Sequence, residues 1–240
     1  MDPLLTLLAA VTGYLCGSIS FARLVSKIAA PQQDITRTEI DVEGSEEKIV
    51  MSAVSATTVS MHLGPRLGFM TVVMDMLKIA IPTLAFKHLV PGASYFLIAA
   101  VTGMLGHIWP LYHGFQGGRG LSAVYGGMFA IDWIGVFATS LGGMVFGLFV
   151  LRDFVVAYMA GLWFIIPWLW FRTHDVGHLA YAIAVNIILA LAMIPEVKQY
   201  VKLRREGKVE DLSKVMQHTG MGRGIYKMAE RFGLLEGKSK

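Results

Sequence analysis

Long, nearly uninterrupted runs of apolar residues dominate the pattern along this chain. Seven runs separated by more polar segments lie at 4–25, 67–86, 93–112, 121–131, 133–151, 154–171 and 176–194. Most are close to the length of about 20 residues with which a helix crosses a bilayer. Since unpaired backbone groups are costly in lipid, we predict an all-α integral membrane protein with about seven transmembrane helices.

The run at 121–131 is short for a complete span. It predicts either a half-helix or one arm of a re-entrant hairpin with the run at 133–151. Irregular backbone at membrane depth is tolerated where it lines a protein cavity, so this region is a candidate wall for a buried site.

The composition agrees with a membrane protein. Of the 240 residues, 55% are hydrophobic and only 16% are charged, against about 25% in an ordinary soluble domain. The mean hydropathy is +0.57. These values argue against a soluble enzyme, and no nucleic-acid partner is expected. The single cysteine, Cys16, excludes an internal disulfide.

The positions of Lys and Arg predict the orientation in the membrane. With seven spans, one set of loops and the C-terminal tail carry most of the basic residues, and the other set contains only Lys87 and Arg172. Basic residues favour the cytoplasmic side. We therefore expect a multi-pass protein of the cell membrane with its N-terminus outside and its C-terminus in the cytoplasm.

We predict a membrane domain at 1–197 that contains a long polar loop, followed by a polar tail. In the cytoplasmic loop 27–66, apolar and polar residues alternate around Gly44 and Ser45, which predicts a small acidic β-hairpin. This hairpin is either a solvated surface element or a partner-binding or lid element. The tail 198–240 is basic, and its apolar residues recur with helical spacing, as in a helix that lies on an anionic membrane surface.

A glycine-rich loop follows the third run. The stretch "FQGGRG" places Gly117, Gly118 and Gly120 around Arg119. Glycines allow backbone N–H groups to surround an anion, and a guanidinium matches phosphate geometry. The helix predicted from residue 121 adds its positive N-terminal end. The loop is a candidate phosphate site, the alternative being a tight turn whose arginine reaches lipid headgroups.

Ionisable residues inside the predicted spans are further candidates. Asp75 and Lys78 are three residues apart on one helical face, and His107 precedes the glycine loop. Charged groups within a membrane often indicate function, although a pair that only locks helices together is the simpler alternative. His107 either packs in the interior or orients the loop. The sequence "SAVSATTVS" before the second long run indicates helix capping or a polar wall.

These motifs resemble those of the bacterial membrane acyltransferases that transfer an acyl group from acyl phosphate to glycerol-3-phosphate. The stretch "GHIWPLYHGFQGGRG" is similar to the family pattern GH-x-x-P, four residues, F-K-G-G-K-G, with Arg119 at a position that is usually lysine. Ser18 matches G-S-I-P-F-A, and "DMLK" resembles D-x-x-K. The resemblance covers about residues 10–200 and implies seven spans with a cytoplasmic active site.

The resemblance implies a phospholipid-biosynthesis enzyme of the cell inner membrane that makes lysophosphatidic acid. Acyl phosphate is already activated, so this reaction needs no covalent nucleophile, metal or other cofactor. The expected substrate-binding residues are Gly117, Gly118, Arg119 and Gly120, with Thr57 and Ser18 as further polar candidates. Lys78, Asp75 and His107 are the expected catalytic residues, Lys78 facing a phosphate or the developing oxyanion.

Other positions depart from the family pattern and leave two alternatives open. The first-loop motif G-S-G-N-x-G-A-T-N-V is matched at Ala56, Thr57 and Val59, but Met61 stands where an arginine is expected. In the third motif, H-R-x-N, Val197 and Tyr200 replace histidine and asparagine. One alternative is a lipid- or phosphate-binding membrane protein that has lost activity. The other is a small-solute transporter, suggested by charges within a span.

Overall fold

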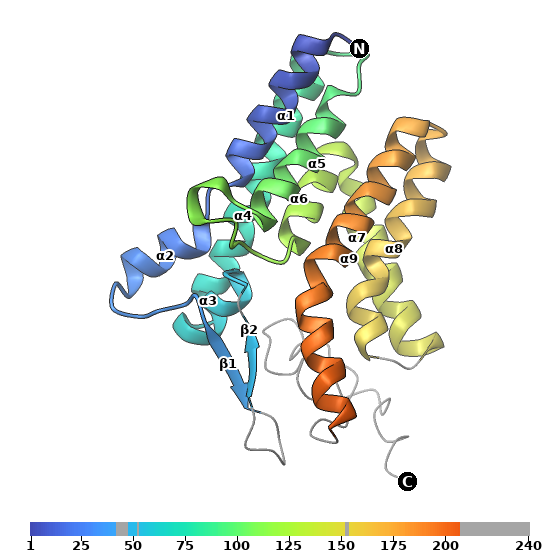
Figure 1. Ribbon diagram of the computed structural model, residues 1–240. Coiled ribbons are helices and arrows are strands. Elements are labelled where there is room, and N and C mark those ends of the chain that lie inside the picture. Colours follow the sequence, from blue (N-terminus) through green and yellow to red (C-terminus); the bar gives the residue numbers. More distant parts are fainter. Residues whose placement is uncertain (42–47, 52, 152–153, 207–240) are drawn as a thin grey trace.

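The computed structural model is a bundle of helices with a small two-stranded sheet at one end (Figure 1). It describes residues 1–41, 48–51, 53–151 and 154–206. The α-helices in this part are α1 (Pro3–Gly17), α2 (Phe21–Ala29), α3 (Ala56–Leu63), α4 (Pro65–Leu89), α5 (Tyr95–Ile108), α6 (Leu121–Ile131), α7 (Trp133–Val145), α8 (Phe154–Thr173) and α9 (Val176–Arg205). The strands are β1 (Thr38–Asp41) and β2 (Lys48–Met51), a 3-10 turn covers Leu111–His113, and a π-helical turn covers Phe146–Val150.

The prediction of a helical membrane protein is confirmed. Five segments of the described chain are long and apolar enough to cross a bilayer: Pro3–Ala29, Pro65–Leu89, Tyr95–His113, Trp133–Val150 and Val176–Gln199. α6 has the bounds expected for the short run, and its 11 residues rise only about 16 Å. The count of seven spans stays a prediction.

The first apolar run does not form one continuous helix, contrary to expectation. α1 ends at Gly17 and α2 begins at Phe21, pointing away from the axis of α1 (Figure 1). The side chain of Ser20 caps α2 by accepting from the backbone N–H of Arg23 at 3.4 Å. The break frees the Ile19 carbonyl from helical pairing, and Lys78 of α4 donates to it at 2.6 Å.

Close contact between α1 and α5 depends on glycine. A side chain at Gly17 would overlap the backbone of Gly103, and one at Gly106 would overlap the backbone of Tyr14. Gly103 and Gly106 of α5 therefore permit a close approach to α1. Such small-residue contacts are a common means of helix association in membranes.

The buried core lies between α4, α5, α6, α8 and α9. Its largest fully buried side chains include Ile79, Met104, Met128, Ile165 and Leu169. The outer surface is also apolar, with Phe69, Ile81 and Phe171 among many large exposed hydrophobic residues. In water such a surface would be an aggregation hazard, whereas in lipid it is the expected exterior.

The first loop forms the two strands expected around Gly44 and Ser45. β1 and β2 pair antiparallel, with Thr38 opposite Met51 and Asp41 opposite Lys48. The connection 42–47 lies outside the described residues, so the turn itself stays a prediction. The sheet lies beside the C-terminal part of α9 (Figure 1), where the Gln199 amide, suitably oriented, exchanges two hydrogen bonds of 3.0 and 3.1 Å with the Val50 backbone.

α9 runs past the boundary predicted between the membrane domain and the tail. It continues to Arg205, so residues 198–205 extend the last apolar helix. Residues 207–240, with the predicted amphipathic helix of the tail, lie outside the described residues.

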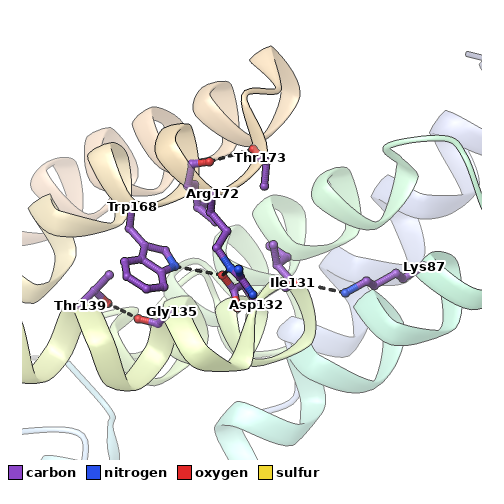
Figure 2. A network of polar contacts seen from close by, with 9 residues as sticks. Lys87, Ile131, Asp132, Gly135, Thr139, Trp168, Arg172 and Thr173 are labelled. Carbon is purple, nitrogen blue, oxygen red and sulfur yellow. Dashed lines mark hydrogen bonds and ion pairs between the residues drawn. The ribbon is translucent and has the colours of Figure 1, made fainter.

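A polar cluster ties the helix ends together at the junction of α6 and α7 (Figure 2). Asp132, the single residue between these helices, accepts from Trp168 Nε1 at 2.9 Å and from Arg172 Nε at 3.1 Å. Lys87 donates to the carbonyls of Ala130 and Ile131 at 2.8 and 2.9 Å. A cation at the C-terminal end of α6 also offsets the negative end of its dipole.

Asp132→Ala is expected to destabilise the bundle because the partly buried indole N–H of Trp168 loses its acceptor. The cost of such an unpaired group is about 1–3 kcal/mol. The measurement is the thermal unfolding midpoint of purified protein in detergent.

Asp132→Asn is the matched control, since its amide oxygen still accepts from Trp168. It should retain most of the stability that Asp132→Ala loses. Equal midpoints for wild type and Asp132→Ala would contradict a stabilising role for this cluster.

Candidate functional site

The glycine-rich loop packs directly on the end of α5. The N–H of Gly118 donates to the His107 carbonyl at 3.0 Å, and a side chain at Gly118 would overlap the His107 ring. A side chain at Gly117 would overlap the same carbonyl and Pro110. These two glycines therefore permit close packing, and the Gly118 N–H is used within the protein rather than left for an anion.

Neighbouring segments hold the outer side of this loop. The carbonyl of Gly117 accepts from the N–H of Val54 in the first loop at 2.9 Å. The carbonyl of Gln116 accepts from Arg23 of α2 at 2.8 Å. The loop thus connects three segments that are far apart in sequence, and its shape is fixed by backbone contacts.

A cavity of about 490 Å³ lies beside the loop. Its polar lining consists of Ser55, Thr57, Ser60, His107, Arg119, Ser122 and Tyr125. Its apolar lining consists of Ala56, Pro65, Phe69, Val72, Met76 and Leu121, with Gly68 and Gly120 completing the wall. A cavity lined by both polar and apolar side chains suits an amphiphilic ligand.

Two helices begin at this cavity. α3 begins at Ala56 and α6 at Leu121, and both residues line it. The first N–H groups of a helix have no intrahelical acceptor, and the N-terminal end carries partial positive charge. Gly120, with φ +94°, precedes α6 and supplies no capping side chain. Both helix ends therefore favour an anion in the cavity.

The small-polar run before α4 has both expected functions. Thr58 Oγ1 accepts from the Ser55 N–H at 3.0 Å and donates to the Ser55 carbonyl at 2.7 Å, which secures the start of α3. The neighbouring Ser55, Thr57 and Ser60 line the cavity. Capping and a polar wall are thus combined in one segment.

Arg119 is the one lysine or arginine among the residues that line the cavity. Its side chain is held by Glu196 of α9: Nε lies 3.0 Å and Nη2 2.9 Å from the same oxygen, Oε1. The other edge of the guanidinium, formed by Nη1 and Nη2, is not used in these contacts. That edge is suited to a bidentate contact with phosphate.

Asp75, Lys78 and His107 meet below the loop. Lys78 Nζ lies 2.7 Å from Asp75 Oδ1, and His107 Nδ1 lies 3.7 Å from the same oxygen. The lysine and the aspartate are almost completely buried. The structure thus brings these three side chains together, and their role in the reaction stays a prediction.

These three side chains line a separate void of only about 10 Å³, together with Ser18 and Gly118. Ser18 Oγ donates to the Tyr14 carbonyl at 2.8 Å and accepts from the Leu111 N–H at 3.3 Å. His107 borders both the void and the large cavity. Of the expected site residues, Thr57, His107, Arg119 and Gly120 therefore line the large cavity, Ser18, Asp75, Lys78 and Gly118 line the small void, and Gly117 lines neither.

Sequence reasoning assigned no role to Glu196 or Ser122, and it named Ser55 only as part of the small-polar run before α4. One feature of the sequence could have identified Glu196: it is an acidic residue at the border between an apolar helix and a basic segment. Ser122 has no such feature, because a small polar residue at the start of a helix is an ordinary cap. Among the residues that the structure describes, no group of three or more His, Cys, Asp and Glu could hold a metal ion.

The sequence pattern of the family "Glycerol-3-phosphate acyltransferase" matches residues 7–205. The chain belongs to the glycerol-3-phosphate acyltransferase family. The match includes every residue that lines the large cavity and the void, and it ends where α9 ends.

Curated members of the glycerol-3-phosphate acyltransferase family share about a third of their aligned residues with this chain. The glycerol-3-phosphate acyltransferase of Desulfotalea psychrophila is 34% identical over 139 residues, covering 53% of this chain and 64% of the relative. That of Cupriavidus metallidurans is 29% identical over 193 residues, covering 79% and 89%. The chain thus matches less than two thirds of the length of the first of these relatives.

The fold is that of a solved member of the family. Crystal structures of PlsY, an integral membrane glycerol 3-phosphate acyltransferase, superpose with TM-scores of 0.65 in the lysophosphatidic acid form and 0.64 in the glycerol 3-phosphate form. Sequence identity is 21% in both comparisons. The alignments cover 85% and 86% of this chain, and 94% and 95% of PlsY.

Gly118→Ala should displace the loop, because the new methyl group would overlap the His107 ring. We expect a fall in the detergent unfolding midpoint that exceeds the effect of Gly114→Ala. Gly114 is the control: it lies in the same loop region with φ +59° and open space around it, so alanine there meets only backbone strain of about 1–2 kcal/mol. A larger loss in the Gly114 variant would contradict the packing role of Gly118.

Proposed function

We propose that this protein transfers a fatty acyl group from acyl phosphate to glycerol-3-phosphate and so produces lysophosphatidic acid. The observation that carries the proposal is the large cavity, whose lining combines Arg119 and the starts of α3 and α6 with apolar side chains of α4. This arrangement suits a molecule with a phosphate at one end and a hydrocarbon chain at the other. Family membership supplies the reaction class, and the names of the relatives supply the acceptor.

In this proposal Arg119 and the start of α6 hold the donor phosphate. The acyl chain lies along Phe69, Val72 and Met76, one face of α4. Each methylene buried there contributes about 0.8 kcal/mol of binding free energy. Phe69 is 70% exposed, so this face of α4 opens the cavity toward lipid.

The acceptor lies at the hydroxyl-lined side formed by Ser55, Thr57 and Ser60. Its hydroxyl oxygen attacks the acyl carbon, the bond from that carbon to the phosphate oxygen breaks, and the proton leaves with the released phosphate. The protein places the two substrates and stabilises negative charge, which suffices for an activated donor. No covalent enzyme intermediate is required.

Asp75 and Lys78 act in this proposal as the support of the site. Lys78 is engaged by Asp75 and by the Ile19 carbonyl, and it lies behind the cavity rather than in it. His107 joins this buried pair to the glycine loop and to the cavity wall. We therefore favour a positioning role for the pair over direct contact with the reacting atoms.

The same proposal places the protein as a multi-pass membrane protein with its cavity toward the cytoplasm and its N-terminus outside. The N-terminus and the first-loop strands lie at opposite ends of the bundle (Figure 1). Lys87 and Arg172, the two basic residues expected outside, converge on the junction of α6 and α7 (Figure 2). Both observations support that orientation.

Arg119→Ala is expected to lower acyl transfer by more than about tenfold, because the donor phosphate loses its cation. The measurement uses purified protein in vesicles with palmitoyl phosphate and labelled glycerol-3-phosphate, followed by lipid extraction. Arg119→Lys, which keeps the charge but not the planar fork, should be intermediate.

Arg37→Ala is the control for loss of one positive charge, since Arg37 is exposed in the first loop. Near-wild-type transfer by Arg119→Ala would contradict the phosphate role. Binding of palmitoyl phosphate by the wild type without any product would instead favour the inactive lipid- or phosphate-binding protein.

Lys78→Gln alone should be strongly destabilising, by about 3–5 kcal/mol, because it leaves the buried Asp75 charge without its partner. The double variant Asp75→Asn, Lys78→Gln removes both charges and retains hydrogen-bonding groups, so it should recover much of that stability. The measurements are the unfolding midpoint and acyl transfer.

A positioning role predicts that acyl transfer recovers together with stability in the double variant. A double variant that is stable but has lost transfer would contradict this role. It would instead support Lys78 as a cation that faces the substrate.

A further inference from the structure

Arg119 does not reach the cavity as a free side chain. Its guanidinium lies against Glu196 of α9, with Nε and Nη2 both within 3.0 Å of Oε1. Both side chains are partly buried, with exposed fractions of 24% and 23%. The contact joins the loop before α6 to a helix 77 residues further along the chain.

The geometry of the contact leaves a defined part of the arginine available. A guanidinium has one edge formed by Nε and Nη2 and another formed by Nη1 and Nη2. Glu196 occupies the first edge. The second edge has no partner in the described part of the chain, and it is the one that can receive two oxygens of a phosphate.

Glu196 is itself held in place. It follows Pro195 in α9, and three residues later Gln199 is bonded to the Val50 backbone of β2. The loop that carries Arg119 is held on its other side by Val54, four residues after Val50. The first loop is therefore bonded to both segments that carry the ion pair, the end of α9 and the glycine-rich loop.

We infer that Glu196 is a positioning residue for the proposed acyl transfer, fixing Arg119 so that its free edge faces the donor phosphate. The inference rests on the proposed function. A carboxylate this close to a phosphate site would otherwise weaken anion binding by repulsion. Glu196 therefore favours phosphate binding only if the orientation that it gives Arg119 matters more than the positive charge that it offsets.

Glu196→Ala is expected to lower kcat/KM for palmitoyl phosphate about tenfold, because a misplaced binding group loses much of its effect. Glu196→Gln should stay within about threefold of wild type, since its amide oxygen accepts the same two N–H bonds. The KM for glycerol-3-phosphate should change little in either variant. Val201→Ala, on the exposed surface of α9, is the control for general effects on this helix.

The decisive comparison is a double-mutant cycle with Arg119→Ala. If Glu196 acts through Arg119, then adding Glu196→Ala to Arg119→Ala produces no further loss. Equal losses from Glu196→Ala in both backgrounds would overturn the inference and indicate a purely structural role. A Glu196→Ala variant with a lowered KM for palmitoyl phosphate would also overturn it, because Glu196 would then be a competitor of the phosphate.

Failure of the proposed function gives a different result. In that case the wild type forms no labelled lipid, or Arg119→Ala transfers as well as wild type. The inference about Glu196 fails alone when Arg119→Ala is impaired but the effects of the two substitutions are additive.

Discussion

The glycine-rich loop 115–120 packs closely on the end of α5, and this packing positions Arg119 and the start of α6 at the cavity. The Gly118 N–H is bonded to the His107 carbonyl, and the space beside it accommodates no side chain. From this fixed point the chain enters α6 through Gly120, which places the helix start and Arg119 at the cavity. The bonds from Val54 and Arg23 then attach the first loop and α2 to the same short segment.

The bilayer explains why such a loop is built from backbone contacts. α6 rises only about 16 Å, roughly half of the hydrocarbon thickness, so its two ends cannot both lie in water if it runs across the membrane. At one end the backbone of Gln116, Gly117 and Gly118 is bonded to neighbouring segments, and at the other Asp132 is paired with Trp168 and Arg172. The C-terminal end of this short helix thus has partners from within the protein, whereas its first N–H groups face the cavity.

Much of the fold could be predicted from the sequence because lipid imposes simple rules. The apolar runs located the long helices, and α6 has the bounds that its run predicts. The break between α1 and α2 was missed, because residues 18–20 are as compatible with a helix as with a cap. Only the position of Lys78, 59 residues further on, explains how the free carbonyl of Ile19 is satisfied.

The candidate site was predictable in part. Short-range motifs identified Arg119, Gly120, His107 and Thr57, all of which line the cavity. The family resemblance also implies that Lys78 faces the substrate, which stays a prediction, while in the structure Lys78 lines the small void and donates to the Ile19 carbonyl. Glu196 was not assigned a role because its partner is 77 residues away, and no local pattern encodes such a contact.

The most direct test of the central claim is an experimental structure with a bound acyl phosphonate, a donor analogue that cannot transfer its chain. The phosphonate oxygens are expected to contact Arg119 and the first N–H groups of α6, with the chain along Phe69, Val72 and Met76 of α4. A phosphonate bound elsewhere, or bound at this cavity without contact to Arg119, would contradict the claim that this cavity is the donor site.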